Sequence, residues 1–253
     1  MNVATMKVKE ETAFKAAPLR NLALLEGLMN RTMERQPHLP GIVTFSGPSG
    51  FGKSTAAAYV AAKKQAHYVE IRSMWTKKPF LEMTLRQMGI IPQKMVNDMI
   101  NQIAEELATS QRPLILDEFD NAVKQHLVEI VRDIYEMSGA SIVLIGEEQL
   151  PQKLQKWERF HGRILAWGQA DAANIDDARA LNKHYEPDVT VEDDLLKMVV
   201  SSAHGSIRRI VTNLNNMAQY ARAEGNETLS ATDWGGRAII GSRAPAARNF
   251  NAV

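Results

Sequence analysis

The feature that most constrains this chain is a glycine-rich segment that lies between an apolar run and an alanine-rich run. It fits the pattern G-x-x-x-x-G-K-[ST] and consists of Gly47, Pro48, Ser49, Gly50, Phe51, Gly52, Lys53 and Ser54. Residues 41–46 read GIVTFS and predict a buried strand, while residues 52–64 predict a helix. A strand, a glycine-rich turn and a helix in this order favour a phosphate-binding loop over an ordinary turn.

The residue types in this loop suit a nucleoside polyphosphate. Glycines let the backbone curl so that consecutive N–H groups point at phosphate oxygens, and the following helix adds the positive end of its dipole. Lys53 would contact the β- and γ-phosphates, and the Ser54 hydroxyl would bind Mg²⁺. We therefore predict that the nucleotide lies along residues 47–55, with Thr55 as the last contact.

A second motif lies at the end of another apolar run. Residues 114–116 read LIL and are followed by Asp117 and Glu118. We interpret this as a Walker B element, in which Asp117 holds Mg²⁺ through water and Glu118 polarises the attacking water. Paired acids also occur in solvated loops, but their position downstream of the phosphate loop in an α/β chain favours the catalytic interpretation.

Apolar strands alternate with helical patterns up to about residue 170. Because strands that are apolar on both faces are typical of parallel sheets, the pattern predicts an α/β fold with helices on both sides of the sheet. One helix is expected along the apolar stripe from Val123 to Ile134. The predicted strands are residues 41–46, 67–71, 114–116, 141–145 and 164–167.

After about residue 172 the strand signals stop, and helices are predicted over 172–184, 191–204, 206–224 and 230–240. Thr190 with Asp193, and Ser230 with Asp233, fit the capping-box pattern at helix starts. We therefore predict a small all-helical lid after the α/β core. The expected divisions are a flexible arm (1–18), the core (19–170), the lid (171–241) and a mobile tail (242–253).

Composition excludes several classes of protein. Lys and Arg number 30 against 29 Asp and Glu, so any nucleic-acid surface must be a local patch. Cysteine is absent, which excludes thiol nucleophiles, disulfides and cysteine-based zinc sites, and fits a cytoplasmic location. No apolar stretch approaches the length of a membrane span, so we expect no membrane partner.

The Asp-Glu pair, the helical region and the segment Gly205-Ser206-Ile207-Arg208 together resemble the AAA+ ATPases, over about residues 19–240. The resemblance implies an enzyme that binds ATP and Mg²⁺ and hydrolyses ATP to ADP and phosphate. It also implies that Arg208, at the start of a lid helix, contacts the γ-phosphate as the sensor 2 arginine. Taken alone, the segment fits a solvated helix start equally well; its position after the fifth strand favours the lid interpretation.

Within the AAA+ class, residues 144–150 and 159–164 resemble the small DNA-transposition ATPases typified by the target-DNA activator of phage Mu. The resemblance implies an arginine finger that reaches a neighbouring subunit's nucleotide, with Arg163 as first choice and Arg159 as second. A finger supplied in trans makes hydrolysis depend on assembly. Glu147 departs from the family, which has a neutral polar sensor 1 residue. Either its carboxylate points away from the γ-phosphate or another residue takes this role.

The same resemblance implies largely sequence-independent binding of double-stranded DNA by an ATP-dependent homo-oligomer or filament. Basic and hydroxyl side chains after the second strand suit contacts to the phosphate backbone. The alternative is a solvated loop with Trp75 in the core. The candidate DNA contacts are Arg72, Thr76, Lys77, Lys78 and Arg86, with Lys94 as an extension.

Three functions follow from these observations. The first is an ATPase that oligomerises on DNA and delivers target DNA to a transposase. The second is a replication accessory of the helicase-loader type, which would bind a hexameric helicase. The third is a monomeric P-loop kinase acting on a small acceptor. The kinase should be monomeric with ATP, whereas a filament former should enlarge when ATP and DNA are both present.

Overall fold

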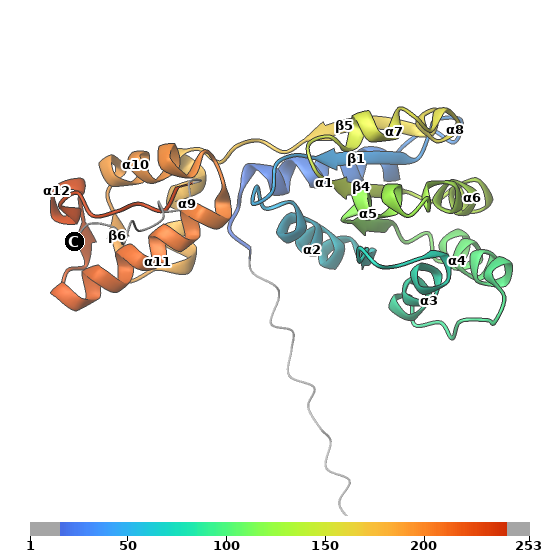
Figure 1. Ribbon diagram of the computed structural model, residues 1–253, viewed down its shortest axis with the longest axis horizontal. Helices are drawn as coiled ribbons and strands as arrows, with labels where there is room; N and C mark the ends of the chain where they lie inside the picture. The colour runs from blue at the N-terminus through green and yellow to red at the C-terminus, as the bar shows by residue number, and fades with distance from the viewer. Residues whose placement is uncertain (1–15, 242–253) are drawn as a thin grey trace, which may run out of the picture.

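A computed structural model describes residues 16–241 of the chain. It consists of a sheet with its covering helices and a separate group of C-terminal helices (Figure 1). The tail predicted for residues 242–253, and the arm predicted for 1–18 except its last three residues, lie outside the described residues. Within residues 16–241, no helix is both long and apolar enough to cross a membrane.

Five parallel strands form the central sheet in the order β2-β3-β4-β1-β5, which confirms the predicted fold class. All side chains of β1, β3 and β4 are buried, as expected for strands covered on both faces. Because these strands are parallel, their carboxyl ends lie at the same edge of the sheet. The strands are β1 (Ile42–Ser46), β2 (His67–Glu70), β3 (Leu114–Asp117), β4 (Ile142–Gly146) and β5 (Ile164–Gln169).

Two helices, α1 (Arg20–Met33) and α2 (Lys53–Lys64), cover one face of the sheet. The small side chains of α2 allow the helix to lie close to the strands, since its four buried residues are three alanines and a valine. This packing fixes the start of α2 directly after the glycine-rich loop. The strand residues on this face are Val43, Phe45, Ile115, Val143 and Ile145.

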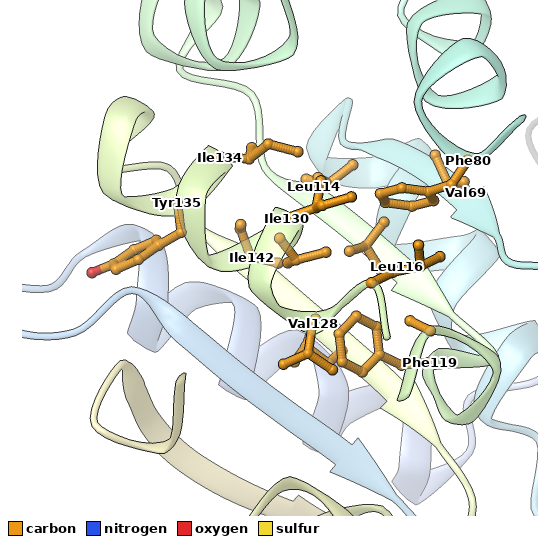
Figure 2. Packing of buried hydrophobic residues seen from close by; sticks show 14 of the residues in the cluster. Val69, Phe80, Leu114, Leu116, Phe119, Val128, Ile130, Ile134, Tyr135 and Ile142 are labelled. Carbon is orange, nitrogen blue, oxygen red and sulfur yellow. The ribbon is translucent and has the colours of Figure 1, made fainter. Parts of the chain in front are cut away.

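Six helices contribute buried side chains to the opposite face, which carries the larger apolar cluster (Figure 2). Alternate residues of β3, Leu114 and Leu116, point into this cluster, while Ile115 points into the other. Phe80, which lies beside Val69 in Figure 2, and Phe119, which lies near Val128, are both completely buried. The helices are α3 (Lys77–Gln87), α4 (Val96–Ser110), α5 (Phe119–Lys124), α6 (Val128–Ser138), α7 (Leu150–Leu154) and α8 (Glu158–His161).

The C-terminal helices have a core of their own, distinct from both clusters of the sheet. Figure 1 shows them beyond the linker that leaves β5, with α11 reaching back toward α1 and α2. The division at residue 170 between core and lid stays a prediction. The helices are α9 (Ile175–Tyr185), α10 (Asp193–Ala203), α11 (Ile207–Glu224) and α12 (Ala231–Trp234).

The expectation that no strand follows residue 172 is wrong. Thr190–Val191 (β6) pairs in parallel with Thr228–Leu229 (β7), and two residues are too few to produce a strand pattern in the sequence. The predicted capping box of Thr190 with Asp193 is wrong for the same reason: Thr190 is part of β6, and α10 begins after Glu192 without a side-chain cap.

Two helix predictions also need correction. The stripe from Val123 to Ile134 spans two helices, α5 and α6, because His126 takes a left-handed conformation with φ of 55°. The helix predicted over 230–240 ends at Trp234, where Gly235 and Gly236 both have positive φ. Its start is as predicted, since Ser230 and Asp233 form the capping box.

The N-terminus of α1 joins the two parts of the molecule. The amide of Asn21, a residue only 4% exposed, donates to the carbonyls of Phe51 and Asp171, each at 2.9 Å. Its oxygen accepts from the Asp171 N–H at 2.8 Å. The Arg20 guanidinium pairs with Asp177 at 3.3 Å. The glycine-rich loop, the linker after β5 and α9 are therefore bound to a single helix end.

We expect Phe80→Ala to destabilise the protein by about 3–5 kcal/mol, because it empties a completely buried position in the larger cluster. Met83→Ala on the same helix, where the side chain is 36% exposed, is the matched control and should cost under about 1 kcal/mol. Urea unfolding followed by circular dichroism measures both. Equal losses would show that the cluster is not the core described here.

Candidate functional site

A cleft of about 380 Å³ opens at the carboxyl ends of β1, β3 and β4, where α11 lies against the glycine-rich loop. Sites at this edge of a parallel sheet are typical of open α/β folds. Five separate chain segments contribute to it. The lining residues are Ser49, Gly50, Gly52, Lys53, Ser54, Thr55, Asp117, Glu118, Gly146, Glu147, Tyr185, Ile207, Arg208, Val211 and Thr212.

The glycine-rich loop depends on two glycines with positive φ, Gly50 at 86° and Gly52 at 79°. A Cβ at Gly50 would lie 2.5 Å from the Ser206 hydroxyl, and one at Gly52 would lie 2.8 Å from the side chain of Ile207. Glycine is therefore needed both for the backbone conformation and for the close approach of α11. The Arg208 N–H donates to the Gly50 carbonyl at 3.2 Å, which joins loop and helix directly.

The Lys53 ammonium group bends back onto its own loop, where it donates to the carbonyls of Gly47 and Pro48 at 2.7 and 2.9 Å. Burial lowers its pKa below the ordinary value, although the carboxylates of Asp117 and Glu118 act in the opposite direction. The ammonium group is held only by neutral carbonyls and lines the cleft beside the glycine-rich loop. This arrangement suits an anionic ligand such as a triphosphate.

Asp117 is 2% exposed, and each of its oxygens accepts one hydrogen bond, which leaves a further lone pair on each. One accepts from the Glu118 N–H at 2.7 Å, and the other accepts from the Tyr68 hydroxyl at 2.7 Å. Tyr68 comes from β2, the strand next to β3, and burial raises the pKa of its hydroxyl, which keeps it a donor. No sequence motif marks Tyr68, because it lies within the strand β2.

The oxygen donors of this cleft suit Mg²⁺. Ser54 supplies a hydroxyl and Asp117 a carboxylate, and a cation of this kind commonly takes one or two protein ligands plus phosphate oxygens and water. Among residues 16–241, no group of three or more His, Cys, Asp or Glu side chains could hold a metal ion by itself. The donor set therefore fits a metal that arrives with a phosphate ligand.

Glu118 lies in the left-handed region, with φ of 55° and ψ of 40°, immediately before α5. Non-glycine residues adopt this conformation at some cost, and such positions concentrate at functional sites. Burial, and next the charge of Asp117, raise the pKa of its carboxyl group above the ordinary value. A carboxylate of raised basicity beside a phosphate-sized cleft can act as a general base.

The cleft also contains Tyr185, which belongs to no motif of the sequence. Tyr185, at the end of α9, is 48% exposed and faces the loop together with Ile207 of α11. A smaller, mainly apolar hollow of about 40 Å³ shares Gly52, Thr55, Tyr185 and Ile207 with the cleft and continues to α1. No short motif marks such positions, because they come together only when the C-terminal helices pack on the loop.

The two predicted finger residues do not line the cleft of their own chain. Arg163 lies before β5, and its guanidinium donates twice to one Glu136 oxygen, at 2.8 and 3.2 Å. Its side chain is 44% exposed, so the ion pair lies in solvent. Arg159 is exposed on α8. Arg208, in contrast, lines the cleft as expected from its sequence position.

The candidate DNA residues are exposed: Arg72, Thr76, Lys77 and Lys78 lie around the start of α3, Arg86 lies in its last turn, and Lys94 follows the helix. Arg72 pairs with Glu70 at 2.9 Å and Lys78 pairs with Glu82 at 3.8 Å, while Lys77 is exposed. Thr76, Arg86 and Lys94 are exposed as well. The indole of Trp75 is half-buried against the larger cluster. Trp75 thus belongs to the core, as in the alternative interpretation, while the basic side chains remain accessible.

The sheet order, the loop and the C-terminal helices define the AAA+ P-loop NTPase fold. Residues 35–154 match the family model described as an AAA domain. This range includes the glycine-rich loop, β3 with Asp117 and Glu118 at its end, and α7. No curated protein sequence matches the chain at a significant level.

Three solved structures are examples of proteins that share this fold. Cdc6p of Pyrobaculum aerophilum is 17% identical, with a TM-score of 0.62 over 87% of this chain and 66% of its own. The ADP form of the ORC2 protein of Aeropyrum pernix is 19% identical, with a TM-score of 0.63 over 83% and 65%. The ORC1 protein of Aeropyrum pernix in complex with DNA is 15% identical, with a TM-score of 0.61 over 84% and 62%. The chain thus spans just under two thirds of each.

We expect Tyr68→Phe to raise the Mg²⁺ concentration needed for nucleotide binding by about tenfold, because Asp117 loses the hydroxyl that orients it. A Mg²⁺ titration with a fluorescent ATP analogue measures the shift. Tyr59→Phe, which removes a hydroxyl from α2 without a hydrogen bond to Asp117, is the control. An unchanged Mg²⁺ requirement in Tyr68→Phe would show that this hydrogen bond does not orient the carboxylate.

Proposed function

We propose that the protein is a Mg²⁺-dependent ATPase that binds double-stranded DNA and assembles with copies of itself, hydrolysing ATP to ADP and phosphate. The observation that carries the proposal is the meeting of Lys53, Asp117, Glu118 and Arg208 around one cleft. These groups come from distant parts of the chain, and together they are the parts that phosphoryl transfer requires: phosphate cradle, metal ligand, base and cation.

Each group has a distinct role in this proposal. The loop N–H groups and Lys53 hold the β- and γ-phosphates, and Ser54 and Asp117 would hold Mg²⁺, which neutralises developing charge on the phosphates. Glu118 orients the attacking water and accepts its proton. Arg208 contacts the γ-phosphate from α11, so that its charge would couple the C-terminal helices to the state of the nucleotide.

The smaller hollow next to the cleft supports a purine base at the other end of the ligand. It is mainly apolar and begins at Gly52 and Thr55, where the phosphate chain of the nucleotide would end and the base would begin. A volume of about 40 Å³ is less than a base requires, so binding would displace Tyr185 or the residues before α1. Nucleotide binding would thereby shift the C-terminal helices relative to the loop.

Self-assembly is supported by the position of Arg163. Its only ion pair among the described residues is with Glu136 in solvent, and exposed pairs of this kind contribute about 1 kcal/mol or less. A neighbouring subunit's γ-phosphate is therefore a competitive partner for this guanidinium. We propose Arg163 as the finger that completes the site in trans, with Arg159 as the second candidate.

DNA binding is supported by the accessible basic side chains around α3 and by the fold shared with the ORC1 protein of Aeropyrum pernix, whose structure contains DNA. The contacts would be to DNA phosphates, since the segment that leads into α3 offers cations and hydroxyls. Delivery of DNA to a transposase, and service as a helicase loader, both stay predictions. The AAA+ fold, with α11 over the cleft, argues against the third alternative, a monomeric kinase for small acceptors.

We expect Glu118→Gln to bind ATP with unchanged affinity but to hydrolyse it at least about 100-fold more slowly, because the amide cannot accept the proton of water. Lys53→Ala should instead lose ATP binding. Phosphate release and fluorescent nucleotide binding separate the two effects. The control is Glu148→Gln, an exposed neighbour outside the cleft. Normal hydrolysis by Glu118→Gln would remove Glu118 from the mechanism.

We expect the double variant Lys77→Glu, Lys78→Glu to bind duplex DNA of any sequence more weakly, and the salt dependence of binding to fall by about two phosphate contacts. ATP binding should persist, since neither residue lines the cleft. Lys183→Glu with Lys197→Glu, two exposed lysines on α9 and α10, reverses the same charge elsewhere. Equal DNA affinity in both double variants would exclude the α3 surface.

A further inference from the structure

A charged group of three residues lies beside the cleft, at the turn that follows β4. The Lys153 ammonium group on α7 lies 2.6 Å from the Asp120 carboxylate and 3.3 Å from the Glu147 carboxylate. Asp120 is 2% exposed, whereas the Glu147 side chain is 62% exposed. Neither the family match nor the sequence motifs give Lys153 or Asp120 a role.

Glu147 creates an electrostatic conflict in the cleft. It lines the same cavity as Lys53, Asp117 and Glu118, and its charge acts on the Lys53 ammonium group. A carboxylate free to turn toward the γ-phosphate would repel it, and could also compete with the phosphates for Lys53. ADP lacks the γ-phosphate, so such repulsion would act mainly against ATP.

We propose that Lys153 is a positioning residue that holds the Glu147 carboxylate away from the γ-phosphate and so prevents it from repelling ATP. The inference rests on the proposed binding of ATP in this cleft. Glu147 lines the cleft, whereas its partner Lys153 on α7 does not. The salt bridge thus draws the carboxylate toward α7.

Asp120 keeps Lys153 in this position. One Asp120 oxygen accepts from Lys153, and the other accepts from the Glu147 N–H at 2.6 Å. The hydrogen bond to Asp120 raises the pKa of the Lys153 ammonium group, so the cation persists at neutral pH. A Cβ at Gly146 would overlap the Asp120 carboxylate, so glycine allows this close contact. Asp120 therefore holds both the backbone of Glu147 and the cation that pairs with its side chain.

The arrangement also joins two elements of the cleft. Asp120 lies in the first turn of α5, two residues after Glu118, and Glu147 follows directly after β4. The buried Asp120 carboxylate therefore links the segment that carries the proposed base to the turn that follows β4. Breaking this link should affect the response to the γ-phosphate rather than the binding of the rest of the nucleotide.

The test is a double-mutant cycle on ATP and ADP affinity, measured by titration calorimetry with Mg²⁺. We expect Lys153→Met to weaken ATP binding by about tenfold and ADP binding by less than about twofold, because it releases one carboxylate into the cleft proposed to hold the γ-phosphate. Adding Glu147→Gln to Lys153→Met should restore ATP affinity to within about threefold of the unmodified protein. Lys156→Met, on an exposed lysine three residues away, is the matched control.

Other outcomes would overturn the proposal. Equal losses for ATP and ADP, without restoration by Glu147→Gln, would mean that Lys153 only maintains the fold. A selective loss of ATP that Glu147→Gln does not restore would mean that Lys153 contacts the γ-phosphate itself. If Lys153→Met does not fold, Lys153→Met with Asp120→Asn removes the unpaired buried charge and should show the same selective loss.

A failure of the proposed function is distinguishable from a failure of this inference. Absence of ATP binding in the unmodified protein would remove the proposed function, whatever the variants do. Normal ATP and ADP binding by both the unmodified protein and Lys153→Met would leave the proposed function in place and exclude Lys153 as a positioning residue.

Discussion

The site depends on the direct contact between the glycine-rich loop and the start of α11. Gly50 and Gly52 provide the positive φ angles of the loop and the space that Ser206 and Ile207 occupy. The hydrogen bond from the Arg208 N–H to the Gly50 carbonyl closes this contact. Two parts of the chain with separate cores thereby share one cleft, and a ligand in the cleft touches both.

The charges around the cleft require balance. Four carboxylates act on the Lys53 ammonium group, those of Asp117, Glu118, Asp120 and Glu147. Hydrogen bonds occupy Asp117, and Lys153 pairs with the Asp120 and Glu147 carboxylates. Of these four carboxylates, only that of Glu118 has neither a hydrogen bond nor an ion pair with another described residue. The arrangement therefore leaves one carboxylate available for chemistry in a cleft suited to anions.

Local patterns predicted the sheet and the loop, because runs of apolar residues and the spacing of glycines can be recognised within a few consecutive residues. The contacts that complete the site were not predictable in this way. Tyr68 reaches Asp117 only through the pairing of β2 with β3, and Lys153 reaches Asp120 only through the packing of α7 on α5. Likewise, Thr190 fits the pattern of a helix cap, but its backbone pairs with Thr228 of β7 and so forms part of the strand β6.

Titration calorimetry of the unmodified protein with ATP in the presence of Mg²⁺ tests the central claim most directly. A cleft made from the glycine-rich loop, Asp117 and α11 predicts saturable binding of one ATP per chain, weaker when Mg²⁺ is chelated. The absence of measurable heat with both ATP and ADP, in a protein whose circular dichroism shows a folded α/β chain, would contradict the account.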